Sequence, residues 1–319
     1  MNVILSNLFK QQKQQKQTKL HMKNKITCLL AGAALFGATA NAEIALADGL
    51  SASGYIDIVA GDTDQAGAAG DRTFDSAEFE IGLNFAPAES AWSATAELSY
   101  DINDAADDAV NTETVAVTYQ HSDALSFTFG QVYTYQGLES HDAPDNYFIT
   151  YAGTGSTDLY SVDFASGICV DYNVGDISLG VWTDAISGAS YEYYAAYTGI
   201  ESLSLAVAIA DNEDNSETTN FMATYELGDY TIMAENVDSE GFGAGDLDIT
   251  SVTVAYSMGD TTLAVRAVDG EYGAADYDKV SVAAFHALSD NVAVGVEYSD
   301  EDLDDVSVEG FGVELLYVF

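Results

Sequence analysis

The sequence of 319 residues has few basic residues for its acidity. Six of its nine Lys and Arg residues precede residue 26, which leaves Arg72, Arg266 and Lys279 against all 52 acidic residues. A surface of that sign repels nucleic acid and anionic lipid headgroups, and it attracts cations. Adaptation to a salty medium is the alternative explanation, because screening makes such a charge tolerable. No nucleic acid partner is therefore expected.

Cysteine, proline and long apolar runs are also scarce. Cys169 is the one cysteine after residue 42, which excludes an intrachain disulfide and a cysteine metal cluster in that part of the chain. The two prolines are Pro87 and Pro144. No run after residue 42 approaches about 18 apolar residues, so the sequence predicts no transmembrane helix there.

The N-terminal segment has the organisation of a secretory signal peptide behind a polar extension. After Met22, two lysines precede an apolar run, and Ala40–Ala42 forms a small-residue cleavage site. We predict that residues 1–42 are removed and that residues 43–319 form the folded domain. The true start, Met1 or Met22, stays open.

The rest of the chain consists of segments of roughly ten residues in which apolar and polar positions alternate. In "FEIGLNF" (79–85), and for most of the final "GVELLYVF" (312–319), every second residue is bulky and apolar. A period of two is that of a strand with two unlike faces. About nine to eleven residues is also the length that a tilted strand needs to cross a membrane.

Short turns and longer acidic segments alternate between these strands. The longer segments include 238–246, 269–276 and 299–305, which we interpret as polar loops on one rim. Residues 158–174 are interpreted as one long strand, because Tyr160 shares the parity of its apolar face. The predicted strands are 50–60, 74–86, 91–102, 110–120, 124–132, 158–174, 176–185, 190–199, 202–211, 217–227, 229–238, 248–258, 260–269, 277–287, 290–299 and 307–319.

This pattern predicts an all-β protein, a transmembrane antiparallel up-and-down β-barrel of about 16 strands. The last strand would pair with the first, so that no edge stays open and lipid covers the apolar face. The signal peptide, the strand pattern and the terminal Phe319 together resemble the Gram-negative outer-membrane porins.

The resemblance implies a passive channel for small hydrophilic solutes, integral to the outer membrane among lipid and lipopolysaccharide, and assembled as a homotrimer. It also implies that Leu315, Tyr317 and Phe319 form the signal read by the barrel-assembly machinery. The long loop after the fifth strand, about 133–157, would fold inward and narrow the pore. Porins usually set basic side chains opposite that loop, and this chain has almost none to offer.

Acidic residues dominate the candidate pore. Rings of carboxylates favour cations, so the predicted channel prefers cations. The residues assigned to the pore lining are Glu78, Glu80, Glu97, Glu113, Asp171, Arg266 and Lys279. Those assigned to the constriction are Glu139, Asp142 and Asp145 of the long loop.

Other functions find little support in the sequence. No enzyme and no firm cofactor are predicted: His141 is the one histidine worth naming, and Ser53 replaces a glycine needed for a nucleophile elbow. A structural or adhesive barrel with a closed lumen stays an alternative. So does a substrate-specific channel, for example for sugars, although the inward Tyr55, Trp182 and Tyr194 are scattered.

Divalent metal ions are considered at one further place. Asp300, Asp302 and Asp304 are spaced like the start of a calcium loop, but Asp305 stands where that loop needs glycine. Loosely bound calcium or magnesium at these aspartates stays open.

Overall fold

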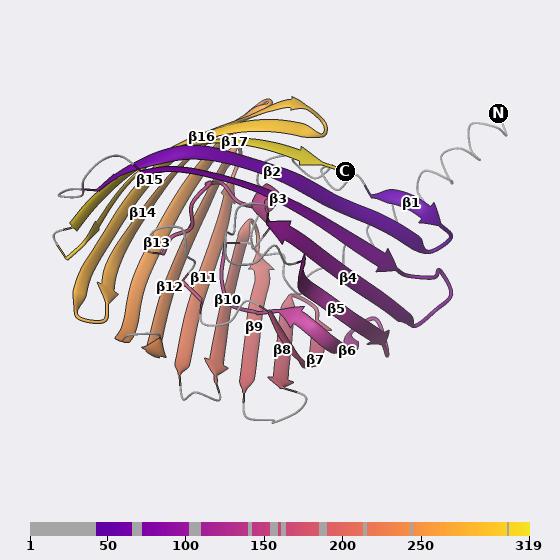
Figure 1. Cartoon of the computed structure of the whole chain (residues 1–319). Coiled ribbons are helices and arrows are strands. Elements are labelled where there is room, and N and C mark those ends of the chain that lie inside the picture. The colour runs from indigo at the N-terminus through magenta and orange to yellow at the C-terminus, as the bar shows by residue number, and fades with distance from the viewer. Residues whose placement is uncertain are drawn as a thin grey trace.

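The computed structural model describes residues 43–65, 72–101, 110–139, 142–153, 159–160, 164–184, 190–212, 216–242, 245–304 and 306–319. They form a closed antiparallel barrel of sixteen strands with one additional short strand, β1 (Ile44–Ala47) (Figure 1). The predicted fold class and strand number are confirmed. The barrel strands are β2 (Leu50–Gln65), β3 (Arg72–Phe85), β4 (Trp92–Asp101), β5 (Val110–Gln120), β6 (Leu125–Tyr133), β7 (Phe164–Val174), β8 (Ile177–Asp184), β9 (Tyr191–Ile200), β10 (Leu203–Asp211), β11 (Glu217–Leu227), β12 (Tyr230–Phe242), β13 (Gly245–Met258), β14 (Thr261–Tyr272), β15 (Ala275–Ser289), β16 (Val292–Leu303) and β17 (Val306–Val318).

The barrel closes where β17 pairs antiparallel with β2, with Val318 opposite Tyr55. Every other barrel strand pairs with its neighbours in the chain, so the order around the wall is the order in the sequence. A 3₁₀ turn, η2 (Ala143–Asp145), lies in the long connection between β6 and β7. No helix among the described residues is long and apolar enough to cross a membrane.

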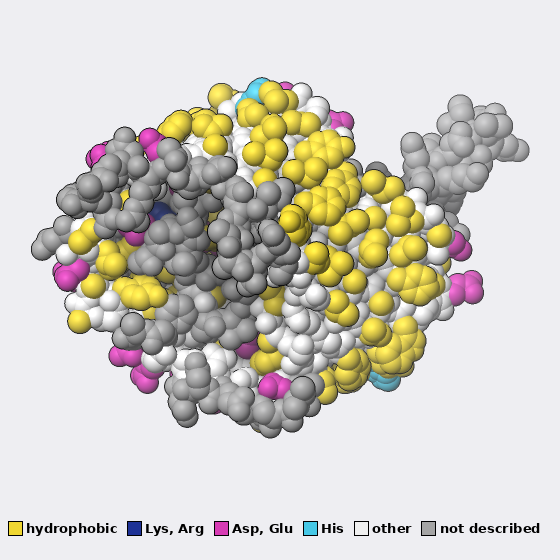
Figure 2. Space-filling model, in the orientation of Figure 1, with side chains coloured by type: hydrophobic (Ala, Val, Ile, Leu, Met, Phe, Trp, Pro, Cys, Tyr) yellow, Lys and Arg dark blue, Asp and Glu magenta, His cyan; other side chains and the backbone are white. Residues whose placement is uncertain are grey.

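The two faces of the wall differ in chemistry. On β2, the side chains of Ile56 and Ile58 are exposed, whereas those of Tyr55, Asp57 and Val59 are buried. The same alternation runs around the barrel, and the outer surface is covered with apolar side chains (Figure 2). Apolar residues outside and polar residues inside reverse the order of a water-soluble protein and suit a barrel surrounded by lipid.

Three of the acidic segments predicted as loops are largely strand. β12 extends to Phe242, β14 and β15 are separated only by Gly273–Ala274, and β16 continues to Leu303. Aspartate and glycine are poor strand formers, which is why composition predicted loops. In the structure the backbone ladder continues through these segments, where carboxylates such as Asp300 are exposed.

The predicted strand 158–174 is too long at its start. β7 begins at Phe164, and Tyr160 lies outside it with its side chain fully enclosed. The parity of Tyr160 matched the strand by coincidence. Its hydroxyl donates a hydrogen bond of 3.0 Å to Glu235 of β12, on the inner side of the wall.

The sequence pattern also missed β1. Ile44 pairs with Ala52 and Ala47 with Leu50, whereas β17 reaches β2 only as far as residue 54. Since β3 occupies the opposite edge of β2, β1 takes the edge position that β17 leaves at its end. Its four residues were too few to show a period.

Candidate functional site

The connection between β6 and β7 lies along the inner face of the wall. Carboxyl and amide oxygens of wall side chains bind its first part. Backbone N–H groups in this segment donate to side chains of three successive regions of the wall. Tyr135 donates to Glu192 of β9 over 3.0 Å, and Gly137 to Asn220 of β11 over 2.9 Å. Leu138 donates to Glu235 of β12 over 3.1 Å. These acceptors satisfy backbone donors that have no ladder partner.

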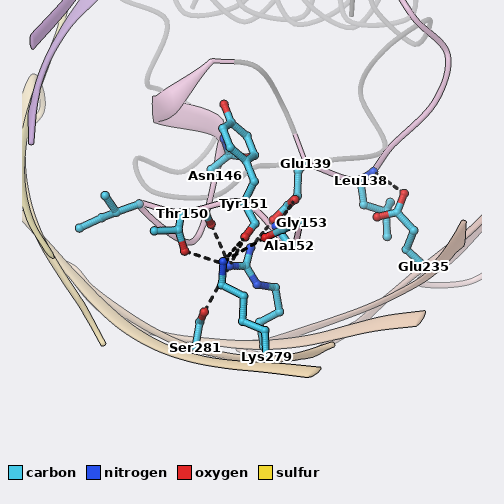
Figure 3. A network of polar contacts seen from close by, with 12 residues as sticks. Leu138, Glu139, Asn146, Thr150, Tyr151, Ala152, Gly153, Glu235, Lys279 and Ser281 are labelled. Carbon is cyan, nitrogen blue, oxygen red and sulfur yellow. Dashed lines mark hydrogen bonds and ion pairs between the residues drawn. The ribbon is translucent and has the colours of Figure 1, made fainter. Parts of the chain in front are cut away.

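Two basic side chains hold the next part of the segment by its carbonyl groups. Arg266 of β14 donates to the carbonyls of Thr150 and Tyr151 over 2.8 and 2.9 Å. Lys279 of β15 donates to the carbonyl of Tyr151 over 2.8 Å and to that of Gly153 over 3.3 Å (Figure 3). Only 1% of each basic side chain is exposed. Both cations therefore serve to anchor the connection.

Carboxylates complete this anchor. Arg266 forms an ion pair with Glu139 of the connection, and Glu139 also accepts the N–H of Ala152 over 2.8 Å. Glu297 of β16 lies 3.9 Å from Arg266 and accepts the N–H of Thr150 over 2.9 Å. Lys279 in turn lies 3.5 Å from Glu301 of β16.

Apolar packing reinforces the polar anchor. Leu138, Tyr147 and Phe148 of the connection join one buried cluster with wall residues that include Met222 and Met233. The guanidinium of Arg266 lies 4.4 Å from the centre of the Phe148 ring. A desolvated contact of this cation–π type contributes on the order of 2 kcal/mol.

A second region of the wall, β2–β5 with β17, is acidic. We call Asp57, Glu78, Glu80, Glu97, Glu113 and Glu314 the acidic belt. Asp57 and Glu78 are directly paired across β2 and β3, and all six side chains are buried or half-buried.

Glu113 reaches the belt through an irregularity in β5. Ala96 of β4 pairs with Val115 and Leu98 pairs with Thr112, so two residues of β5 stand opposite Glu97 alone. Such a β-bulge re-aims the side chains beside it. Glu113 is consequently buried on the belt side even though Val115 and Thr112 are exposed.

The connection brings a further acid toward the belt. Asp142 is the N-cap residue of η2, Asp145 is the last residue of η2, and Ala143 packs against the buried cluster of Tyr55 and Leu316. Burial raises the pKa of Asp142 well above its usual value, and the nearby carboxylates of Asp145 and Glu97, followed by others of the belt, raise it further. The carboxyl group of Asp142 therefore faces the carboxyl groups of the belt, with the anchored cations on a different part of the wall.

A family model described as Gram-negative porin matches residues 29–306. The chain belongs to the Gram-negative porin family. It is an integral barrel of the outer membrane, and the family and fold support a channel. A search of curated proteins gives no match.

Solved structures share this porin's fold. A triply substituted variant of the porin of Rh. blastica aligns with a TM-score of 0.62 and 18% identity, over 85% of this chain and 100% of that one. An outer membrane protein of Vibrio cholerae, OmpT with loop L8 deleted, aligns with a TM-score of 0.60 and 16% identity, again over 85% and 100% of the two chains.

The porin places the three predicted constriction residues in two environments. Glu139 is paired with Arg266 within the anchor, and Asp145 lines a pocket together with Glu139 and Glu235, whereas Asp142 lies toward the acidic belt. The sequence offered Glu139 as an acid of the long loop, but no pattern could show its pairing with a residue on β14. Asp171 of β7 accepts a hydrogen bond of 2.7 Å from the hydroxyl of Tyr135, so it also positions the connection.

The remaining predicted residues are found as follows. Leu315 and Tyr317 are exposed on the outer face of the porin, and the Phe319 ring stacks on Tyr317 with centroids 6.2 Å apart. Asp300 and Asp302 belong to β16 and Asp304 to the turn after it. The described carboxylates that gather as a potential metal-ligand group are instead Glu78, Glu80 and Glu113. His141 lies outside the described residues.

Sequence reasoning missed the residues that hold the connection in this porin. Asn220, Glu235, Glu297 and Tyr277 all bond to it, the last through a 3.0 Å hydrogen bond from its hydroxyl to the carbonyl of Ala152. In the sequence these residues could be recognised only as inward-facing positions of alternating strands, which they share with many other residues.

Proposed function

We propose that this porin is a passive channel for small hydrophilic solutes that prefers cations. The observation that carries the proposal is the separation of charge within the barrel. Arg266 and Lys279 are both occupied by carbonyls and carboxylates of the anchor, while the acidic belt and Asp142 face each other. A lumen with that arrangement holds a negative potential, and a negative potential concentrates cations.

The sugar-channel alternative receives less support. Trp182 and Tyr194, two of the three inward aromatic residues that could have lined a sugar path, pack against the connection. The rings of Tyr194 and Tyr135 stack with centroids 5.2 Å apart, and Trp182 belongs to the same buried cluster. Tyr55 is buried with Leu316 and Val318. A continuous aromatic path along the lumen is not formed by these three residues.

The test is the reversal potential of the purified protein in a planar bilayer under a potassium chloride gradient. We expect the sign that indicates cation preference, larger at low salt because screening is weaker there. Asp57→Asn with Glu97→Gln should reduce the preference. Asp302→Asn with Asp304→Asn removes the same charge from the rim and should change it less. An unselective or anion-selective wild-type channel would overturn the proposal, and absence of conductance would favour the closed-lumen alternative.

Membership of the porin family also supports proposals about partners. We infer assembly as a homotrimer in contact with lipid and lipopolysaccharide, after insertion by the barrel-assembly machinery. Chemical cross-linking of the protein in isolated outer membranes should yield a species of three times the chain mass. A monomer at all cross-linker concentrations would contradict the trimer and leave the channel proposal untouched.

A further inference from the structure

We propose that Glu78, Glu80 and Glu113 form a site for one calcium ion on the inner wall of the barrel. This inference goes beyond cation preference, which needs only a diffuse negative potential. It assigns a defined divalent ion to three residues. Each of the three offers a carboxylate oxygen, and these oxygens all lie within 4.8 Å of one another.

The spacing suits calcium. Calcium binds oxygen ligands at about 2.3–2.6 Å, so two oxygens on one ion are separated by at most roughly 5 Å. Magnesium binds at about 2.0–2.1 Å and requires a tighter octahedral arrangement, with oxygens no more than roughly 4 Å apart. Three oxygens that all lie within 4.8 Å of one another fall inside the span that a calcium ion can bridge.

The burial of Glu80 is a second and independent indication of a ligand. Only 6% of Glu80 is exposed, and its Oε2 is enclosed without a hydrogen-bond partner among the described residues. A buried carboxylate oxygen without a donor is costly unless a cation or a proton compensates it. Since Arg266 and Lys279 are engaged elsewhere, neither of them compensates Glu80.

The wall is built so that these side chains meet. Glu78 and Glu80 are two residues apart on β3 and therefore share its inner face. Ser99 of β4, which pairs with Glu80, is a small buried residue between β3 and β5. The bulge in β5 turns Glu113 toward β3, so that its carboxylate oxygen lies within 4.8 Å of those of Glu78 and Glu80. Three strands thus supply a rigid frame for the carboxylates.

The test is calorimetric titration of calcium chloride into the purified, folded full-length barrel in detergent, at neutral pH in potassium chloride. We expect saturable binding of one calcium ion per chain. Glu80→Gln with Glu113→Gln should weaken it by about ten-fold or more, because calcium affinity follows the number of charged ligands. Asp300→Asn with Asp302→Asn is the matched control at the rim and should leave this binding unchanged.

Two results would overturn the site. The first is absence of saturable calcium binding in the wild type, which would mean that shared protons compensate the carboxylates. The second is binding that survives in the Glu80/Glu113 variant or is lost in the Asp300/Asp302 variant, which would locate the ion at the rim. Heat-modifiable migration on electrophoresis checks that each variant is folded before titration.

A further readout separates this inference from the proposed function. Calcium at constant ionic strength should raise the unfolding temperature of the wild type and not that of the Glu80/Glu113 variant, because a ligand that binds only the folded state stabilises it. Neither this shift nor the titration requires ion conduction. A cation-selective channel without calcium binding, or the reverse, would therefore be recognised as such.

Discussion

Gly54 and Phe319 exchange two backbone hydrogen bonds, each 2.9 Å long, at the seam of the barrel. The aromatic ring of Phe319 also stacks on Phe79 of β3 with centroids 6.3 Å apart. A methyl group added at Gly54 would lie 2.2 Å from the carbonyl oxygen of Glu80 and 2.8 Å from the Phe319 ring. The terminal residue is thus a structural part of the closure.

Deletion of Phe319 should sharply reduce the amount of folded barrel in the outer membrane. The deletion removes both hydrogen bonds with Gly54 and the ring contact with Phe79, and it removes the residue that we expect the assembly machinery to recognise. The measurement is the heat-modifiable fraction in isolated outer membranes. Phe319→Tyr keeps the backbone and the ring and serves as the control. Equal amounts from the deletion and the wild type would show that the seam closes without Phe319.

Replacement of Arg266 by methionine should release the connection from the wall. Glu139 would lose its cationic partner, and removing one member of a buried pair costs on the order of 3–5 kcal/mol. We expect greater open-channel noise in a bilayer and faster protease cleavage between residues 134 and 153. Glu139→Gln in the same chain should partly restore the wild-type behaviour, since the uncompensated charge is then gone. Noise and cleavage like those of the wild type would mean that the remaining contacts suffice.

Single cysteines should report the two rims of the barrel. In a Cys169→Ala background, cysteines at Tyr272 and Asp304 should react with an impermeant thiol reagent applied to intact cells. Cysteines at Gly228 and Gly259, in the tight β11–β12 and β13–β14 turns on the rim where β17 ends, should react only after the cells are opened. Labelling of both sets from outside would contradict this orientation.

Cation preference should continue to rise with pH above the range in which exposed aspartates titrate. The raised pKa of Asp142 means that its charge is absent at acidic pH and is gained only as pH passes the raised value. The neutral form is favoured in the folded barrel, so ionisation of Asp142 lowers folded-state stability as pH rises. The measurement is the reversal potential from pH 5 upward, with divalent ions chelated. Asp142→Asn should flatten this rise, and an identical profile in the variant would exclude Asp142 as its source.

Screening by salt should stabilise the rim. Asp278 of β15 stands opposite Asp269 of β14 and also opposite Asp302 of β16, which makes a row of like charges. Like charges directly opposite are destabilising. We expect the unfolding temperature to increase with potassium chloride, and Asp278→Asn to reduce that increase. A control at Asp290, which is outside this row, should keep the wild-type dependence on salt.

The alternation of apolar residues made the barrel predictable because lipid imposes a strict period of two on every strand. Most predicted strands agree with the structure within a few residues. A shift of one residue would turn a lipid-facing side chain such as that of Ile56 toward the lumen, so the register of each strand is strictly specified. The period of two did not identify strands beyond the apolar band, where the side chains do not contact lipid. The acidic ends of β12, β14 and β16 read as loops, because above the apolar band only backbone pairing holds them in the sheet.

The site was less predictable because it depends on contacts between residues distant in the sequence. The position of Tyr160 in the sequence matched the alternation of the lipid-facing residues of β7. Its hydroxyl nevertheless donates a hydrogen bond to Glu235 on the inner side of the barrel. Glu139 had the composition of a pore acid, yet it pairs with Arg266 from the opposite half of the chain. No local period encodes either pairing, since both depend on where the connection crosses the barrel.

The seam between β2 and β17 has a consequence for the order of folding. Tyr55 and Val318 come from opposite ends of the folded domain, so their pairing has the greatest loop-closure cost of the ladder and must form late. Until then, the first and last barrel strands both carry unpaired N–H and C=O groups, which recruit other chains. The edge of β2 from residue 50 to residue 52 is protected early, because β1 is its immediate neighbour in the chain. We therefore expect the lifetime of the open-edged intermediate to limit the yield of this barrel more than the stability of the closed one.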